Sequence, residues 1–400
     1  MSTKGYIQAS DKDNVALYIH WPFCVSKCPY CDFNSHVVEH VDHGAWHEAL
    51  LRELAFEAQR TDAKRLHSIF FGGGTPSLMH ANTVRAIIDE AKALWRFGDN
   101  LEITIEANPG TADSERFFAF KEAGINRLSL GVQSLDAKQL EFLGREHSPS
   151  DAMHAIALAG DSFDHLSFDL IYARPGQTKK EWRNELLRAL DVLKSAGGTH
   201  LSCYQLTIEE NTPFKRDFEN GLFSLPDEDM GAALFNLTQD ILNDAGMPAY
   251  EISNHAQPGS AGRHNTHVWK GGMYVGIGPG AHGRTPVNGM VHSIRKHKPP
   301  AQWLKNVLRQ GHSTLEDISL KPKDRGEEMV MLGLRLTEGL DLTSMEQQTG
   351  LPRYSVISRD SLKALESGGL VVCSSGRLCV TRRGRLVLNS IIEALLLHVD

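Results

Sequence analysis

The sequence predicts an α/β protein in which six strand–helix units precede a small α+β domain. Two observations lead to this fold class. Short apolar runs alternate with amphipathic stretches from Ala16 to about Leu206, and after about residue 310 the pattern changes to helices and a short hairpin. Strands that alternate with helices are typical of βαβ units and of a parallel sheet.

Six apolar runs are the expected strands, at 16–20, 68–73, 102–107, 127–132, 166–172 and 200–206. Helical patterns lie between them, at 45–60, 82–95, 114–123, 135–143 with 151–159, and 179–194. In "EALLRELAFEAQR", for example, apolar residues recur at helical spacing. Six units are fewer than the eight of a complete barrel, so the pattern fits a partial barrel or a doubly wound open sheet. Periodicity alone does not choose between them.

The later part of the chain changes composition twice. Residues 207–250 predict a loop and one helix, and the glycine- and histidine-rich segment after them predicts turns and short strands packed against the sheet. Helical patterns at 326–336, 342–350 and 354–367, a hairpin around Ser374-Ser375-Gly376 and a final helix predict a winged-helix-like domain. The expected parts are a tail at 1–14, a barrel domain at 15–250, a connecting segment at 251–310 and the C-terminal domain at 311–400.

Composition narrows the class of protein. The 400 residues are 41% hydrophobic and carry a formal net charge of -7, which argues against a general nucleic-acid binder, and Arg382, Arg383 and Arg385 do not extend into a long basic face. No apolar run approaches the roughly 20 residues that span a bilayer, and the polar N-terminus does not resemble a signal peptide. We therefore expect a cytoplasmic protein without a transmembrane segment.

Polar residues gather at the ends of the expected strands. Three cysteines follow the first strand, "GGGTPS" ends the second, and the next three strands carry Glu106, Gln133 and Asp169. Arg145 lies in the loop after the fourth strand. Because ligands bind at the carboxyl ends of parallel strands, these residues predict one site on one rim of the sheet.

The cysteines have the spacing C-x3-C-x2-C, at Cys24, Cys28 and Cys31. A [4Fe–4S] cube normally takes four thiolates, so three would leave one iron open to a chelating small molecule. The alternative is a zinc site completed by His20 or His36, because zinc with three cysteines and one histidine is common.

The stretch "YIHWPFCVSKCPYCDF" resembles the signature of the radical S-adenosylmethionine (SAM) superfamily. The resemblance implies a six-unit partial (β/α) barrel in which three cysteines hold a [4Fe–4S] cluster and SAM chelates the fourth iron. "FFGGGTPS", "IEANPG", "RLSLGVQS", "GREH" and "DLIYARPGQT" resemble the branch that contains oxygen-independent coproporphyrinogen III oxidase. The residues that this resemblance implies at the cofactors are Tyr18, Tyr30, Gly73, Gly74, Thr75, Glu106, Gln133, Arg145 and Asp169. Whether one or two SAM molecules bind stays open.

Two functions compete within that branch. The decarboxylating enzyme carries a further cysteine two residues after the third, where this chain has Phe33. "CDFNSH" and "HNTHVW" instead resemble the HemW-type haem chaperones, whose motif is HN-x2-YW; here Val268 replaces the tyrosine. We therefore expect a haem chaperone with no catalytic residue, and an oxidative decarboxylase of coproporphyrinogen III is the alternative.

The resemblance implies haem as a further cofactor and client haemoproteins as partners. His264 is the expected haem ligand, although a surface histidine is the alternative, and His255, His267 and His282 could substitute for it. Trp269 could stack on the porphyrin, and Arg263 and Lys270 could meet its propionates. The clients could be membrane-bound respiratory enzymes, which would bring the protein to the inner face of the membrane. A homodimer is one possible oligomeric state.

Overall fold

The computed structural model describes residues 13–63 and 65–396, so the N-terminal tail expected at 1–14 lies mostly outside the described residues. Its centre is a parallel sheet of six strands in chain order, which confirms the six predicted units. These strands are β1 (Asn14–Trp21), β4 (Arg65–Gly73), β5 (Arg96–Ala107), β6 (Arg127–Gln133), β7 (His165–Tyr172) and β8 (His200–Gln205). The short pair β2 (Phe23–Cys24) and β3 (His36–Val37) lies in the loop after β1.

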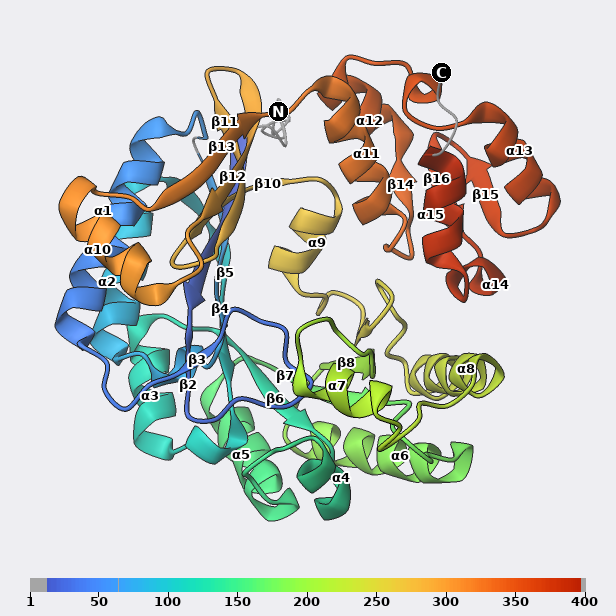
Figure 1. Ribbon diagram of the computed structural model, residues 1–400, viewed down its shortest axis with the longest axis horizontal. Helices are drawn as coiled ribbons and strands as arrows, with labels where there is room; N and C mark the ends of the chain where they lie inside the picture. Colours follow the sequence, from blue (N-terminus) through green and yellow to red (C-terminus); the bar gives the residue numbers. More distant parts are fainter. Residues whose placement is uncertain (1–12, 64, 397–400) are drawn as a thin grey trace, which may run out of the picture.

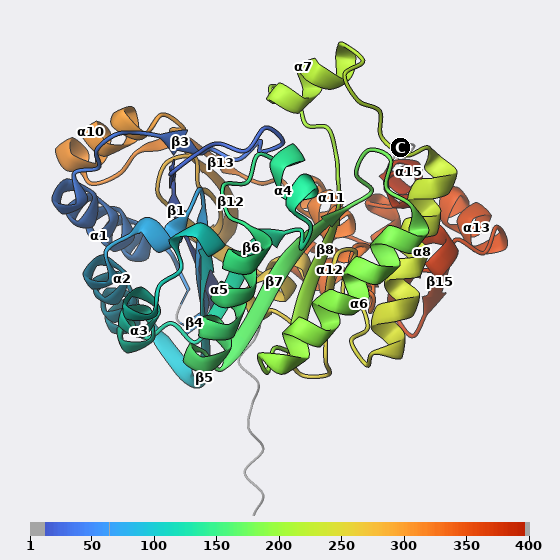
Figure 2. The same cartoon turned by 90° about the horizontal axis from the view of Figure 1, so that it is seen from below.

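The sheet does not close into a barrel. Beyond β1 it continues through β10 (Met273–Ile277), which is parallel to β1, and then through antiparallel β11 (His282–Val287), β12 (Met290–Lys296) and β13 (Thr314–Ser319). Beyond β8 it ends at antiparallel β9 (Asn254–Ala256). The curved six-stranded part is therefore a partial barrel with an open side, as Figures 1 and 2 show.

Helices cover the outer face of the curved sheet (Figure 2). They are α1 (His43–Arg60), α2 (Ala81–Leu94), α3 (Ser114–Ala123), α5 (Pro149–Ser162) and α6 (Lys179–Ser195), and α10 (Pro300–Gln310) packs on α1. Outward side chains such as Ile69 and Phe71 of β4 are fully buried in the large core beneath these helices. Each such burial stabilises the fold by about 1.5–3 kcal/mol, so the rim stands on a rigid base.

Two short helices differ from the sequence prediction. Residues 207–250 form α7 (Pro213–Glu219) as well as α8 (Glu228–Asp244), where one helix was expected. The segment expected to form only turns and short strands contains α9 (Arg263–Trp269). The helix predicted at 135–143 is confirmed as α4 (Ala137–Phe142). The two unpredicted helices have seven residues each and complete only about two turns, so hydrophobic periodicity does not reveal them.

The C-terminal domain has the predicted winged-helix-like content and its own core. Its elements are α11 (Pro322–Gly333), β14 (Leu340–Asp341), α12 (Leu342–Thr349), α13 (Arg359–Ser367), β15 (Val371–Ser374), β16 (Arg377–Val380), α14 (Arg382–Arg385) and α15 (Leu388–Leu396). The hairpin turns at Ser375 and Gly376, which both have positive φ, as a two-residue turn requires. The domain lies beside α9 (Figure 1).

Among the described residues, no helix is both long and apolar enough to cross a bilayer.

Candidate functional site

The carboxyl ends of β1, β4, β5, β6 and β7 surround one cavity of about 140 Å³. Almost all the predicted rim residues lie together at this cavity. Those that line the cavity are Cys24, Cys28, Tyr30, Cys31, Gly73, Gly74, Thr75, Glu106, Gln133, Arg145 and Asp169. Tyr18 is not among the lining residues; its hydroxyl lies 3.0 Å from Nδ1 of His20.

The cysteine loop presents each sulfur to a hydrogen-bonding side chain. The hydroxyl of Thr75 donates to Sγ of Cys24 at 3.3 Å, and Nη1 of Arg145 donates to Sγ of Cys28 at 3.3 Å. Oγ of Ser35 lies 3.8 Å from Sγ of Cys31. Hydrogen bonds to sulfur are one of the ways in which a protein tunes an iron–sulfur cluster, so this donor set fits such a cluster.

The glycine loop after β4 packs directly against the cysteine loop. The backbone N–H of Gly74 donates to the carbonyl of Trp21 at 2.7 Å, and that of Thr75 donates to Phe23 at 2.8 Å. A Cβ added to Gly74 would lie 2.7 Å from the Phe23 carbonyl and 3.0 Å from Sγ of Cys24. Gly73 has a φ of 115°, a conformation that strains any other residue. Only glycine therefore allows the two loops to approach so closely.

Two partly buried carboxyl groups, Glu106 and Asp169, face the cavity from neighbouring parts of the sheet. Burial, and then the charge of Asp169, raise the pKa of Glu106 to about 8, although the Gly73 N–H donates to its Oε2 at 3.2 Å. Burial also raises the pKa of Asp169 to about 6, against hydrogen bonds from Ser202 and Ser129. Buried carboxyl groups at such pKa values are suited to receive a cationic group, which would favour their charged forms.

Arg145 and Gln133 complete the rim with constrained geometry. Nη2 of Arg145 donates to the Gly131 carbonyl at 2.7 Å, while its Nε is buried without a hydrogen-bond partner. Gln133 has a φ of 69°, which is uncommon for a residue other than glycine. Strained backbone and unpaired buried donors occur preferentially at functional sites.

The zinc alternative finds no support in this geometry. Within residues 13–63 and 65–396, no three side chains of His, Cys, Asp or Glu are grouped so that they could hold one metal ion. Nε2 of His20 lies 2.9 Å from the carbonyl of Asn34, and Nε2 of His36 lies 3.1 Å from Oδ1 of Asn34. A single tetrahedral ion requires all its ligands about 2.0–2.3 Å away, whereas each thiolate of an iron–sulfur cube binds a different iron.

His264, the expected haem ligand, lies outside the rim cavity and is buried. It is only 6% exposed, so the alternative of a surface histidine is wrong. Its Nδ1 lies 3.0 Å from the hydroxyl of Ser68, and its ring packs 5.0 Å from that of Phe70. Burial lowers its pKa to about 3, so the imidazole is neutral at physiological pH.

The other predicted haem residues lie in several environments. His255 is buried, and His282 is exposed at the start of β11. Arg263, His267 and Lys270 line a second cavity beside α9. The ring of Trp269 packs under the guanidinium of Arg335 at 5.2 Å, and its indole nitrogen is buried without a hydrogen-bond partner.

The sequence prediction missed several residues of the two cavities. Ser129 and Asn108 also line the rim cavity, and Ser129 could have been found because it shares the face of Gly131 and Gln133 at strand periodicity. His67 of β4 lines the second cavity. Nothing in the local pattern distinguishes His67 from the chain's other histidines.

Comparisons with known proteins fit this geometry. Residues 18–189 match the Radical SAM superfamily, and residues 320–387 match the HemN C-terminal domain. The chain is 36% identical to "Heme chaperone HemW" of Escherichia coli, over 96% of this chain and 98% of that protein. It is 34% identical to the bovine mitochondrial "Radical S-adenosyl methionine domain-containing protein 1", over 97% and 88% of the two chains.

Among solved structures, that of coproporphyrinogen III oxidase (HemN) from Escherichia coli is similar, with a TM-score of 0.80. The match covers 97% of this chain and 91% of that one at 22% identity. At this level of identity the likeness concerns the fold, which the two chains share from the partial barrel through the C-terminal domain.

Proposed function

The chain belongs to the radical SAM superfamily and, within it, to the HemW family, and from this premise we propose that it is a haem chaperone. In this proposal it carries a [4Fe–4S] cluster with SAM at the rim cavity, binds haem and delivers it to client haemoproteins. The observation that supports it most is the similarity to proteins named heme chaperone along nearly the whole length of both chains.

The rim residues fit the cluster and SAM as donors. Cys24, Cys28 and Cys31 would hold three irons, each sulfur keeping its neighbouring donor from Thr75, Arg145 or Ser35. When bound and reduced, such a cluster would supply an electron to SAM. The glycine loop would leave room for the amino acid end of SAM, because glycine has no side chain there.

The carboxyl groups would orient the charged parts of SAM. Glu106 is partly buried and accepts a hydrogen bond from the Gly73 N–H, and no cationic side chain among the described residues pairs with it, so an ammonium group within reach would favour its ionised form. We assign Tyr30, Gln133, Arg145 and Asp169 to the same binding site because they line the same cavity. Tyr18 would contribute to this binding site indirectly, because its hydroxyl positions the ring of His20.

Phe33 favours the chaperone over the decarboxylase. Its side chain lines the rim cavity and is 59% exposed, where the decarboxylase has a thiol. An apolar side chain can neither donate a proton nor form a bond to a porphyrinogen. The rim therefore lacks one group that the decarboxylation would use, although it has the donors that hold a cluster.

The haem ligand and the clients are the finer parts of the proposal. His264 is the ligand that the resemblance implies, but its packing against Phe70 means that haem could reach it only if α9 moved. We further propose that the protein acts in the cytoplasm, that it meets clients such as respiratory enzymes at the inner face of the membrane, and that it associates as a homodimer.

One sample can test the chaperone against the enzyme. Protein reconstituted anaerobically with iron and sulfide is titrated with haem while the Soret band is recorded, and the same protein is then incubated with coproporphyrinogen III, SAM and a reductant. We expect a saturable haem complex and no protoporphyrinogen. Conversion of coproporphyrinogen III would show that the protein is the decarboxylase and not a chaperone. The absence of haem binding would contradict the chaperone function.

A further inference from the structure

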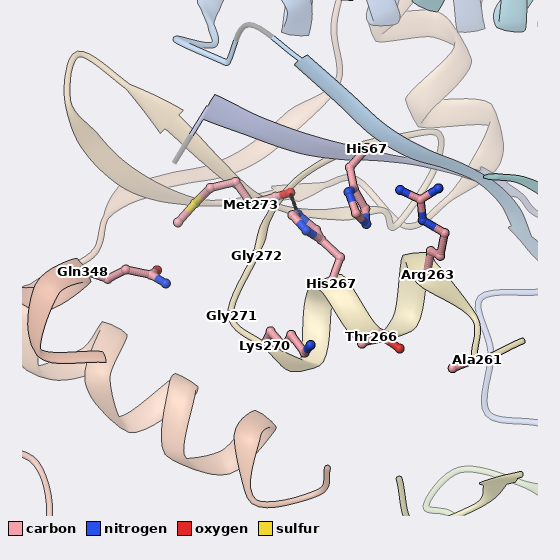
Figure 3. A pocket seen from close by; sticks show the side chains of 10 residues that line it. All are labelled: His67, Ala261, Arg263, Thr266, His267, Lys270, Gly271, Gly272, Met273 and Gln348. Carbon is pink, nitrogen blue, oxygen red and sulfur yellow. Dashed lines mark hydrogen bonds between the residues drawn. The ribbon is translucent and has the colours of Figure 1, made fainter. Parts of the chain in front are cut away.

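A second cavity, of about 400 Å³, lies between α9, the turn that follows it, β4 and the C-terminal domain. Figure 3 shows its lining, with the side chains of His67 and His267 next to each other and Gln348 of α12 on the far side. This volume is within the range of small-molecule sites. Among the described residues that line the cavity none is acidic, and two, Arg263 and Lys270, are cationic. The lining therefore suits an anionic ligand.

A β-bulge directs His67 toward this cavity. Along β1, Val15 pairs with Leu66 and Ala16 pairs with Ser68, so His67 has no partner in the ladder. The pairing with β5 also passes from Leu66 to Ser68. A bulge inserts one residue and turns its side chain, and bulges are frequent next to functional sites. His67 is thus turned out of the sheet, while Ile69 two residues later is buried in the core.

The ring of His67 has the surroundings of a metal-ligating imidazole. The ring of His67 forms a hydrogen bond with the backbone of Arg263. This bond favours the protonated ring, so one ring nitrogen is the donor. In the neutral imidazole, the ring nitrogen that does not donate carries a lone pair. Histidines that ligate metals characteristically donate their other N–H to a backbone carbonyl or a carboxylate.

His267 fixes the plane of this ring. The two rings are stacked with centroids 4.4 Å apart, and Nε2 of His267 lies 2.8 Å from the carbonyl of Met273 (Figure 3). A Cβ at Gly272 would lie 2.3 Å from Nε2 of His267, so the turn after α9 is shaped around this ring. The stacked pair offers a rigid imidazole face beside two cationic side chains.

We propose that this cavity is the haem site and that His67, oriented by His267, offers the nitrogen that binds the haem iron, with Arg263 at a propionate. The inference rests on the proposed haem function and assigns it a place and a ligand. Haem matches the lining in three respects. Its iron would bind a neutral imidazole, its planar ring would lie beside the stacked imidazoles, and its two carboxylates would lie near the cationic side chains.

Haem and iron-free protoporphyrin IX are the two probes of the test. His67→Ala is expected to lower haem affinity by tenfold or more and to shift the Soret band, while protoporphyrin IX affinity changes by less than about threefold, because only haem uses the iron bond. Added imidazole is expected to restore the wild-type Soret position in this variant. Ala261→Trp, which fills the cavity without removing a ligand, is expected to weaken both probes.

Matched variants keep the result interpretable. His165→Ala removes an exposed histidine at the start of β7 and is expected to leave both affinities unchanged. A normal haem titration of the folded His67→Ala protein would overturn the inference, as would an equal loss of affinity for both probes. If that titration is normal and His264→Ala loses the Soret shift, the ligand is His264 instead. If the wild-type protein binds no haem, the proposed function itself fails.

Discussion

The rim cavity and the cavity beside α9 are built in different ways. The rim cavity collects residues from short motifs that each end a parallel strand. The second cavity joins His67, the segment 261–273 and Gln348 of the C-terminal domain, which are far apart in the chain. A site at strand ends follows from the topology of the sheet, whereas a site between domains follows from their packing. The comparison predicts that the two cavities can be disabled separately.

Removal of a cluster cysteine is expected to have the largest effect on one cavity alone. Cys24→Ala, Cys28→Ala or Cys31→Ala should abolish the iron and sulfide content and the brown absorbance of anaerobic protein, because in the proposed cluster each thiolate would hold one iron. The haem titration should stay within about twofold of wild type. Cys373→Ala, in the C-terminal hairpin, is the control. Stoichiometric zinc without sulfide in the wild type would contradict this prediction.

A methyl group at the glycine loop is expected to have the next largest effect. Gly74→Ala brings a Cβ to 2.7 Å from the Phe23 carbonyl, so the glycine and cysteine loops must separate. We expect SAM affinity, measured through the electron paramagnetic resonance signal of the cluster, to fall by tenfold or more. Gly44→Ala is the matched control, because its Cβ would make only an ordinary 3.5 Å contact with Asp42. Equal SAM affinity in both variants would separate this loop from the SAM site.

Glu106 makes stability depend on pH at the rim. Its pKa is raised from 4.5 to about 8 on folding, so between these values the unfolded chain has released a proton that the folded chain keeps. The free energy of unfolding of the unliganded protein therefore falls as pH rises through this window. Asp169, with a pKa of about 6, acts in the same direction between its ordinary pKa and about pH 6.

Denaturant unfolding at pH 5, 6.5 and 8 measures this dependence. In the wild type we expect the free energy of unfolding to decline by a few kcal/mol over this range, because each unit of pKa shift corresponds to about 1.4 kcal/mol. Glu106→Gln is expected to flatten this decline. Glu122→Gln, an exposed change on α3, should leave the slope as in the wild type. An unchanged slope in Glu106→Gln would mean that this carboxyl group is ionised in the folded protein.

The smallest effect is expected at the edge of the second cavity. Lys270 pairs with Glu338 at 2.7 Å, but the two side chains are 52% and 45% exposed. Exposed ion pairs contribute about 0.2–1 kcal/mol and are screened by salt. Lys270→Ala should therefore lower haem affinity by less than about fivefold, and added salt should reduce the difference. A loss comparable to that of His67→Ala would move the propionate contact from Arg263 to Lys270.

The sequence was informative where local pattern determines structure. Six strands and the residues at their ends could be predicted, because period-two patterns and short spaced motifs are local signals. Gln133 and Glu106 reach one cavity simply because their strands are parallel neighbours. The sequence could not reveal the bulge at His67, since an extra residue in a strand leaves no local mark. It also did not reveal α9, whose seven residues place His264 against the sheet and His267 in the cavity.

The parallel pairing of β1 with β10 also constrains how the protein is made. Val15 pairs with Met273, so the outer edge of β1 has no partner until roughly 250 further residues have been synthesised. At about 5–20 residues per second this interval is roughly ten to fifty seconds. During that time a strand whose Leu17 and Ile19 are fully buried in the finished protein leaves its backbone groups unpaired on one side. Unpaired apolar edges are sites of aggregation, so this edge of β1 is open to pairing with other chains until the segment that contains β10 has been synthesised.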